Sequence, residues 1–449
     1  MKLSKLFFMA AMGLGLVACT ENDLVEGGDS NGAQNEGTTY VGFSLKFNAS
    51  NTRATGEENG TEAEQNIKTA YVLMADASGN VEQIVSTSKK GTGTSNTNTD
   101  YYVFETTAGV HYFYAVVNPD TDPTMVGDNA TAKTIGGYFN AGVALTVGDI
   151  ASTTGNGNFM MASHEVLTAN VEDGVTEDEA LKGTKNCFAI NVERATAKVT
   201  MTCDSETLTN APNNAGGTLD ETQFTLKQGA GVSFRMAQAS IIADDNNTFE
   251  YTSSPTSVYI KGTDPSEKED NIHRSAAPVY CLENIRGSYL QGNTTYLTLK
   301  TTFTPDKVVD CADEVKPLTK NKQAPGSTFY VVKQGVLAGN YLMGADLQSY
   351  RDSKSDQSAL PAGVEAISEA YTEGTCWFGP IWIGQEKADD AIAPIYRNTW
   401  YNLEITGITL PGDPEEPTID PEQPLTPKTN VAITLSVMPW NFINRKIDL

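Results

Sequence analysis

Histidine and positive charge are both scarce in this sequence of 449 residues. It contains three His, and its 31 Lys and Arg residues stand against 56 Asp and Glu residues, which gives a formal net charge of −25. Binding to nucleic acid or to an anionic membrane surface relies on clustered Lys and Arg, so this balance argues against both kinds of partner. With only His111, His164 and His273, a His-rich metal centre or several His-dependent acid/base pairs cannot be built.

Motifs for catalysis and cofactor binding are also missing. The chain has no G-x-S-x-G, no P-loop and no G-x-G-x-x-G after a strand. His164-Glu165 has no second His at helical spacing, and the stretch from Asp346 to Asp356 does not have the ligand pattern of a calcium loop. We therefore expect no enzyme activity, no catalytic residue, no cofactor and no metal.

No apolar run is long enough to cross a bilayer, which takes about 20 helical residues. Lys2 and Lys5 precede a shorter apolar run, which ends in Leu16-Val17-Ala18-Cys19 and has the form of a secretory signal. Small residues before a Cys are what a lipoprotein signal peptidase reads, so Cys19 is the expected lipidation site. The alternative is an ordinary signal peptide with a chance Cys.

The other five Cys are widely spaced. Their pattern fits neither a dense disulfide framework nor a metal-binding pair, so most are expected to be buried as small hydrophobes, with one or two disulfides left open. These residues are Cys187, Cys203, Cys281, Cys311 and Cys376.

What the chain does have is many short segments rich in β-branched and aromatic residues, separated by turn residues. Together with the scarcity of helical periodicity, they predict an all-β chain of β-sandwich domains, with a boundary near residue 190. Residues 48–66 show no apolar period and predict a disordered loop. The expected strands are 40–47, 70–75, 101–105, 110–118, 157–161, 188–201, 237–243, 294–303, 328–332, 376–383 and 400–408.

The C-terminal end has a different composition. Six prolines between residues 411 and 427 predict an extended polyproline-type spacer, at about 3.1 Å per residue and on the order of 50 Å in reach. A strand follows, with Val431, Ile433, Leu435 and Val437 on one face, and Trp440 or Phe442 as an aromatic anchor. We expect a strand on such an arm to reach a neighbouring molecule rather than rejoin its own sheet.

The first and last strands have matching patterns. Val41, Phe43, Leu45 and Phe47 alternate as the last strand does, so the last strand of another copy could replace the first by β-strand addition. Arg53 directly follows the first strand in a polar loop, and loops of this kind are where proteases cut. Cleavage of the Arg53–Ala54 bond would detach the first strand. The alternatives are two ordinary sandwich strands and a solvated surface Arg.

In this order, these features resemble the Bacteroidales fimbrillins, the type V pilins, and are most similar to the major subunit of the short fimbriae (the Mfa-type branch). The segments that carry the resemblance are the lipobox at 16–19, the first strand followed by Arg53-Ala54, residues 192–199 (VERATAKV), residues 396–403 (YRNTWYNL), the Pro/Glu-rich spacer, and the ending at 437–449.

The resemblance implies two transthyretin-like β-sandwich domains with a Pro-rich C-terminal arm and a terminal donor strand. Such a protein reaches the outer membrane as a palmitoylated lipoprotein and loses its N-terminal strand to a protease. Its subunits then join by donor-strand exchange into a surface fimbrium. The implied segments are 1–19 (signal peptide), 20–53 (propeptide with the first strand), 54–190 (N-terminal domain), 191–410 (C-terminal domain), 411–430 (spacer) and 431–449 (donor strand).

The expected function is that of a shaft subunit supporting adhesion, biofilm formation and host colonisation. Its expected partners are other copies of itself, accessory tip and anchor subunits, surface glycoproteins of host or bacteria, and the outer membrane through a transient lipid anchor. Two alternatives stay open: a tip or anchor subunit, and a non-polymerising surface lipoprotein that binds glycan or host protein. The last of these would keep Cys19 and its first strand, whereas a shaft subunit loses both.

Overall fold

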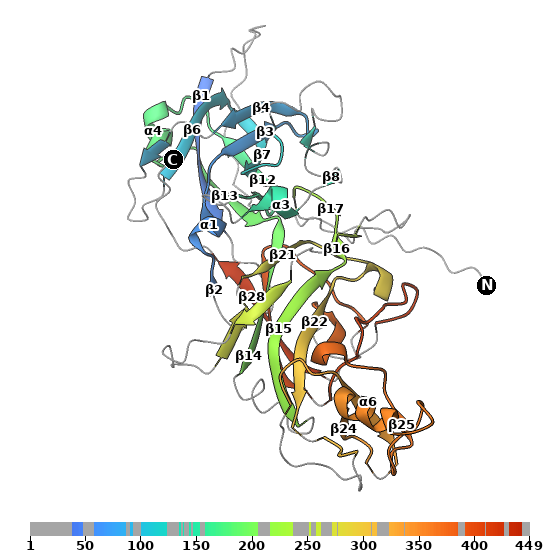
Figure 1. The fold of residues 1–449 in the computed structure, drawn as a ribbon. Coiled ribbons are helices and arrows are strands. Elements are labelled where there is room, and N and C mark those ends of the chain that lie inside the picture. Colours follow the sequence, from blue (N-terminus) through green and yellow to red (C-terminus); the bar gives the residue numbers. More distant parts are fainter. Residues whose placement is uncertain are drawn as a thin grey trace, which may run out of the picture. The chain divides into compact units, whose positions relative to one another are not determined.

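The chain is built mainly from β-strands in a computed structural model, which confirms the all-β prediction (Figure 1). All of the described residues lie in the compact unit Gly37–Leu449. The structure describes residues 38–47, 58–86, 90–92, 100–123, 134–135, 138, 143–144, 147–152, 158–204, 216–236, 251–252, 257–261, 272–275, 277–306, 308–311, 323–335, 337–384, 391–408, 410–425 and 431–441.

The first large sheet contains nine of the described strands, in the order β4-β3-β7-β11-β13-β1-β6-β5, with β12 beside β7. Two short pairs, β10 with β9 and β17 with β8, form separate two-stranded sheets. The bounds are β1 Thr38–Phe47, β3 Ala70–Ala75, β4 Val81–Ser86, β5 Lys90–Thr92, β6 Asp100–Thr107, β7 Gly109–Val117, β8 Val143–Ala144, β9 Ala151–Ser152, β10 Asn158–Phe159, β11 Met161–Ser163, β12 Leu167–Val171, β13 Cys187–Arg194 and β17 Val232–Ser233.

The second large sheet has the order β2-β28-β27-β14-β20-β19-β15-β22-β26, with β21 beside β14. A pair, β16 with β18, and a small sheet, β24-β23-β25, complete the described strands. The bounds are β2 Glu58–Asn59, β14 Thr196–Asp204, β15 Gly217–Lys227, β16 Gly229–Ala230, β18 Tyr251–Thr252, β19 Val258–Lys261, β20 Ile272–Ser275, β21 Val279–Leu282, β22 Tyr296–Pro305, β23 Phe329–Gln334, β24 Tyr341–Met343, β25 Ala366–Ile367, β26 Thr375–Trp382, β27 Thr399–Ile408 and β28 Val431–Asn441.

Helices are few and short among the described residues. They are α1 Glu62–Gln65, α3 Val147–Ile150, α4 Glu177–Leu181 and α6 Gly344–Asp352, with 3-10 turns η1 Gln291–Asn293 and η2 Thr372–Gly374. Both α1 and α4 begin with a capping box, in which a Thr hydroxyl and a Glu carboxylate three residues later each bond the other's main-chain N–H. These caps allow helices of only four and five residues to form where the chain needs a single turn.

Each large sheet has its own apolar core. Alternating residues of β1, β3, β7 and β13 supply the first, around Phe43 and Phe113. Residues of β14, β15, β22, β26 and β27 supply the second, around Phe224, Phe303 and Phe329. This follows from the period of two in each strand, which puts every second side chain on the same face.

Most of the predicted strands are present, and 70–75 has the same bounds as β3. The predicted strand 188–201 is divided: β13 ends at Arg194 in the first sheet, and β14 begins at Thr196 in the second. The long strand β15 was not predicted. The whole of the predicted strand 237–243 lies outside the described residues.

The prediction for residues 48–66 was wrong over 58–66, which hold β2 and α1, with Glu64 fully buried. The expectation of a projecting spacer was also wrong, because residues 411–425 lie along the second sheet. Prolines cannot donate, but their carbonyls accept here: Gly292 N donates to Pro421 O (3.0 Å) and Gln291 Nε2 to Pro424 O (3.0 Å). Leu425 is buried in a cluster with Tyr289, Tyr296, Trp382 and Ala393.

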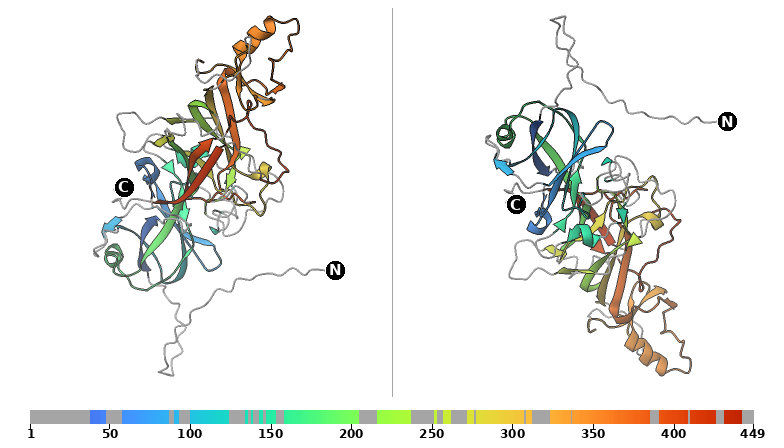
Figure 2. Two further views of the ribbon diagram at one scale, coloured as in Figure 1. Left: turned by 90° about the horizontal axis from the view of Figure 1, so that it is seen from below. Right: turned by 90° about the horizontal axis from the view of Figure 1, so that it is seen from above.

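The last strand rejoins its own sheet, contrary to our expectation. β28 pairs antiparallel with β27 from Ile408↔Val431 to Thr399↔Pro439, and can be followed in red in Figure 2. This pairing is possible because β28 begins beside the end of β27: Val431, its first residue, lies opposite Ile408, the last residue of β27. On its other side, the described part of β28 pairs only at Trp440 and Asn441, with β2.

Candidate functional site

The first strand lies inside the first sheet rather than at its edge. β1 runs parallel to β13, from Gly42↔Cys187 to Phe47↔Val192, and antiparallel to β6, from Thr38↔Thr107 to Phe43↔Tyr102. The two pairings overlap at Gly42 and Phe43, so β6 is the strand partner of the first half of β1 and β13 that of the second half. The loss of β1 would therefore leave β6 and β13 with unpaired edges facing each other.

One face of β1 is anchored in the apolar core. Val41 and Phe43 have no exposed surface, and Leu45 packs against the same cluster. The Phe43 ring centroid is 4.5 Å from that of Phe113 and 5.6 Å from that of Phe104. The predicted common face is thus observed for these three residues, while the side chain of Phe47 lies outside the described residues.

The opposite face of β1 is covered by α4. Gly42 and Ser44 are both buried, and a Cβ added to Gly42 would lie 2.7 Å from the carbonyl oxygen of Ala180 in α4. Ala180 itself is fully buried with Val103 and Val175. β1 is therefore enclosed on both faces and has no room for a side chain at Gly42.

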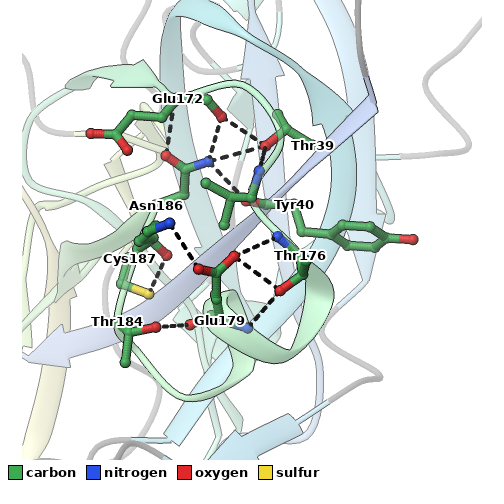
Figure 3. Close-up of polar contacts among 10 residues, drawn as sticks. Thr39, Tyr40, Glu172, Thr176, Glu179, Thr184, Asn186 and Cys187 are labelled. Carbon is green, nitrogen blue, oxygen red and sulfur yellow. Dashed lines mark hydrogen bonds and ion pairs between the residues drawn. The ribbon is translucent and has the colours of Figure 1, made fainter.

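A set of polar groups around the buried residues Thr39 and Asn186 holds the N-terminal end of β1, and we call Thr39, Glu172, Val175 and Asn186 the polar latch (Figure 3). The Thr39 hydroxyl donates to Glu172 O (2.7 Å) and accepts from Val175 N (3.0 Å). Asn186 Nδ2 donates to Tyr40 O (3.0 Å) and Glu172 O (2.9 Å), while its Oδ1 accepts from Glu172 N (2.8 Å). Asn186 has a φ of 45°, a conformation that Asn tolerates better than most residues.

Local charges stabilise α4, the helix that covers β1. Glu179 pairs with Lys185 at 2.8 Å and accepts from the Thr176 main chain (Figure 3). The hydrogen bond from Lys185, with those from Thr176, lowers the pKa of Glu179 to about 2. The carboxylate stays charged at neutral pH and fixes the first turn of α4, which carries Ala180.

The chain just after the expected cleavage site is held by a buried ion pair. Glu64 Oε1 lies 3.0 Å from Lys198 Nζ and accepts from the Tyr280 hydroxyl (2.6 Å), and both Glu64 and Lys198 are buried. Burial opposes the charge of Glu64, but the attraction of Lys198 and the hydrogen bonds from Tyr280 and Thr61 outweigh it and lower its pKa. Glu64 thereby fastens α1 to β14 and β21, while β2 pairs with β28.

Two segments that carried the family resemblance lie side by side. β14 and β27 pair parallel, with Lys198 opposite Trp400. Asn398 N donates to Thr196 O (2.8 Å), and Arg194 Nη1 donates to Asn398 Oδ1 (3.2 Å). The conspicuous polar residues of both segments are therefore structural.

Several expected site residues cannot be placed. Cys19, Arg53, Ala54 and Phe442 lie outside the described residues, and the side chains of Val431, Ile433, Leu435, Val437 and Trp440 are not described, although the β28 backbone is. Their roles in lipidation, cleavage and strand donation remain predictions.

Four of the described cysteines, Cys203, Cys281, Cys311 and Cys376, are buried as expected, and Cys187 is half-buried. In the part of the chain that the structure describes, no cluster of three or more His, Cys, Asp and Glu could bind a metal ion. Over the same residues, the helices are all too short or too polar to cross a bilayer.

Sequence reasoning missed the polar latch and the cover by α4. Two signals were available: the capping box Thr176-x-x-Glu179 marks a helix start, and Gly42 interrupts an otherwise large-residue strand. Neither signal says which strand the helix covers, since that contact joins residues far apart in the chain.

Solved structures with some similarity to the chain include fimbrial proteins. A fimbrilin (FimA) from Porphyromonas gingivalis is 16% identical, with 91% of this chain and 99% of that chain covered and a TM-score of 0.46. The tip fimbrial protein Mfa3 from the same species, with a C-terminal truncation, is 14% identical, with 90% of this chain and 100% of that chain covered and a TM-score of 0.43. Both similarities are low. No curated protein matches the chain.

The family model described as "Major fimbrial subunit protein type IV, Fimbrillin, C-terminal" matches residues 369–446. The matched region contains β26, β27, the Pro-rich segment and β28. These are the elements that place the C-terminal strand at the side of the second sheet. Residues 369–446 thus match the fimbrillin C-terminal model, which confirms the predicted resemblance to the fimbrillins, while the Mfa-type branch stays a prediction.

Proposed function

We propose that this protein is the shaft subunit of a fimbrium, assembled by protease-triggered donor-strand exchange. The fimbrillin match supports a fimbrial subunit, and the finer steps are our proposal. A cut after Arg53 releases β1, and the C-terminal strand of a second copy takes its place. The resulting surface fibre supports adhesion, biofilm formation and host colonisation. We assign it to the short-fimbria branch.

The observation that carries this proposal is the enclosed position of β1. Burial of an apolar side chain such as Val41 or Phe43 contributes about 1.5–3 kcal/mol, and leaving their place empty would expose the core and two sheet edges. The strand precedes Arg53 directly, so one cut severs it from the rest of the fold. A subunit cut in this way has a strong drive to accept another strand.

The position of β28 makes it a suitable donor. Its described length is paired with β27 along one side and, at Trp440 and Asn441 alone, with β2 on the other. In the place of β1 it would pair with β6 over the first part of its length and with β13 over the last, as β1 does at 38–43 and 42–47. Exchange therefore gives β28 main-chain partners from two strands of the first sheet in place of its pairing with β27 and β2.

Export and domain structure complete the proposal. Palmitoylation of Cys19 carries the precursor to the outer membrane, and removal of residues 20–53 frees the subunit from the lipid. We propose two transthyretin-like sandwiches, at 54–190 and 191–410, although the structure places β1 in the first sheet and β2 and β28 in the second. A donor segment at the C-terminus favours a shaft over a tip subunit.

The test compares Arg53→Ala with Arg351→Ala in cells that display the protein. The first variant should accumulate as uncut monomer, while the second, an Arg change in α6, should give an SDS-resistant ladder in unboiled samples with subunits that begin at Ala54. Long ladders from Arg53→Ala would refute cleavage at this bond.

Deletion of 431–449 tests the donor segment. Cut subunits without this segment can accept a strand but cannot donate one, so adding them to assembling wild-type subunits should shorten the ladder in proportion to their amount. This readout does not require the deleted subunit to polymerise. Unshortened ladders, with the deleted subunit shown to be folded by its circular dichroism, would contradict donation by β28.

A further inference from the structure

The first strand and the C-terminal segment match at one constant offset. Thr39, Val41 and Leu45 recur as Thr429, Val431 and Leu435, each 390 positions later, the difference between 429 and 39. At the same offset, small residues of the C-terminal segment correspond to the two small buried residues of β1. Ala432 corresponds to Gly42, and Thr434 corresponds to Ser44. Exposed Lys46 corresponds to Ser436.

We propose that the C-terminal segment of a second copy replaces β1 in β1's own direction, each donor residue lying at the place of the residue 390 positions before it. This inference rests on the proposed function and adds the register and direction of the joint. Two features of the β1 enclosure select this register: the contact with α4 and the polar latch.

The contact with α4 disfavours every donor side chain at this place, and the smallest one least. A Cβ at the place of Gly42 lies 2.7 Å from the main-chain oxygen of Ala180, so the α4 backbone must shift even for alanine, and must shift further for any larger residue. Ala432 is the smallest residue between 431 and 437. Shifting the donor by two positions brings Thr434 to this place, and reversing its direction about Thr434, which corresponds to Ser44, brings Ser436. A shift by one position brings Val431 or Ile433.

The polar latch selects the same register independently. Without Thr39, Val175 N and Glu172 O lose the hydroxyl that lies 3.0 and 2.7 Å from them in a fully buried position. A buried N–H without a partner is costly, so a donor with a hydroxyl here is favoured over one without. At the constant offset this residue is Thr429. It lies outside the described residues, and its assignment to this place rests on the sequence offset.

A native cysteine can report the register. Cys187 is the β13 partner of Gly42, and its thiol lies 3.4 Å from Ala180 O, the same atom that a Cβ at Gly42 would approach. In an assembled fibre, Ala432→Cys should thus place a second thiol beside that of Cys187. Neighbouring strands are about 4.8 Å apart, within the Cα range of a disulfide.

The experiment uses matured full-length subunits carrying Ala432→Cys, Thr434→Cys or Ser436→Cys. Assembled fibres are treated with diamide, which takes up the two thiol hydrogens as the disulfide forms. We expect Ala432→Cys alone to give a ladder that survives boiling without reductant. The ladder should collapse with reductant, or when Cys187→Ser is added. Residues two and four positions along the strand are about 7 and 13 Å further away, too far to bridge.

Each other outcome has a distinct meaning. Cross-linking by Thr434→Cys would overturn the offset, and cross-linking by Ser436→Cys would overturn the direction. If all three cysteine variants form SDS-resistant ladders in unboiled samples but none of them forms a disulfide with Cys187, the proposal that the donor strand lies beside β13 is wrong. If wild-type matured subunits form no ladder at all, the proposed function fails before the register is tested.

A second measurement tests the latch without cysteine chemistry. Thr429→Val should lower the temperature at which SDS dissociates the fibre, whereas Thr426→Val, three positions before it, should leave that temperature unchanged. Thr429→Ser, which keeps the hydroxyl, should restore most of the loss. Equal behaviour of Thr429→Val and wild type would contradict the placement of this residue in the latch.

Discussion

Replacing Thr39 by Val in the uncut precursor should loosen β1 selectively. Val has nearly the same shape and suits a strand, so the change removes little besides the hydroxyl. Val175 N is then buried without a partner, at a cost of about 1–3 kcal/mol, and the hydrogen bond to Glu172 O is lost, at about 0.5–1.5 kcal/mol. We expect a loss of about 2–4 kcal/mol in the free energy that keeps β1 in place.

Hydrogen exchange of the precursor, followed by mass spectrometry, measures this loss where it occurs. Peptides covering 38–47 and 172–187 contain the amides of Tyr40, Gly42 and Val175 that bond across the latch. At about 1.4 kcal/mol per tenfold, these amides should exchange roughly 30 to 700 times faster than in wild type. Peptides from the second sheet should not change.

The matched control is Thr106→Val. Thr106 lies directly opposite Thr39 in β6 and is also buried, but its hydroxyl donates to the Met74 sulfur, a weak acceptor. Its loss should therefore accelerate exchange by less than about tenfold. Equal acceleration in the two variants, or acceleration spread over both sheets, would refute the idea that the Thr39 hydroxyl holds the strand.

Three further outcomes follow. Ile433→Phe would restore in the donor the ring that Phe43 inserts into the core, so fibres of this variant should dissociate in SDS at a higher temperature than wild type; a lower temperature would count against the offset. Cys19→Ala should leave unprocessed precursor and no surface fibre by immunoblot and electron microscopy, and normal fibres would contradict the lipoprotein route. Glu64→Ala removes the carboxylate that compensates the buried charge of Lys198 and should cost about 3–5 kcal/mol in thermal unfolding, while Glu179→Ala, at a partly exposed capping-box residue, should show no comparable loss. Because the folded state lowers the pKa of Glu64, its contribution should be present at neutral pH and fade as the pH falls through that lowered pKa, so the gap between Glu64→Ala and wild type should narrow in acid.

The parts of the site that follow a local period could be predicted from sequence. Val41, Phe43 and Leu45 alternate, and alternation alone places them on one face of a strand. The same period predicted the strand that begins at Val431, and the backbone of this strand, β28, pairs antiparallel with β27. Local pattern does not say where in a sheet a strand lies, so the central position of β1 came only from the structure.

Contacts between distant residues could not be predicted. Glu64 sits in a polar, Gly-rich stretch that reads as disordered, yet Lys198, 134 residues later, compensates its burial. Thr61-x-x-Glu64 is a capping box that could have indicated the helix, though not its burial. Asn186 belongs to no period at all, because its role depends on a positive φ and on partners in β1.

The docked Pro-rich segment sets how stiff a fibre of these subunits would be. With residues 411–425 held against their own sheet, only residues 426–428 separate the anchored Leu425 from Thr429, the first donor residue of the proposed joint. Three residues span at most roughly 11 Å, far less than the whole segment would reach if it were free. Successive subunits joined by such short links have little freedom to swivel, so the fibre should bend gradually, like a rod, rather than hinge at each joint.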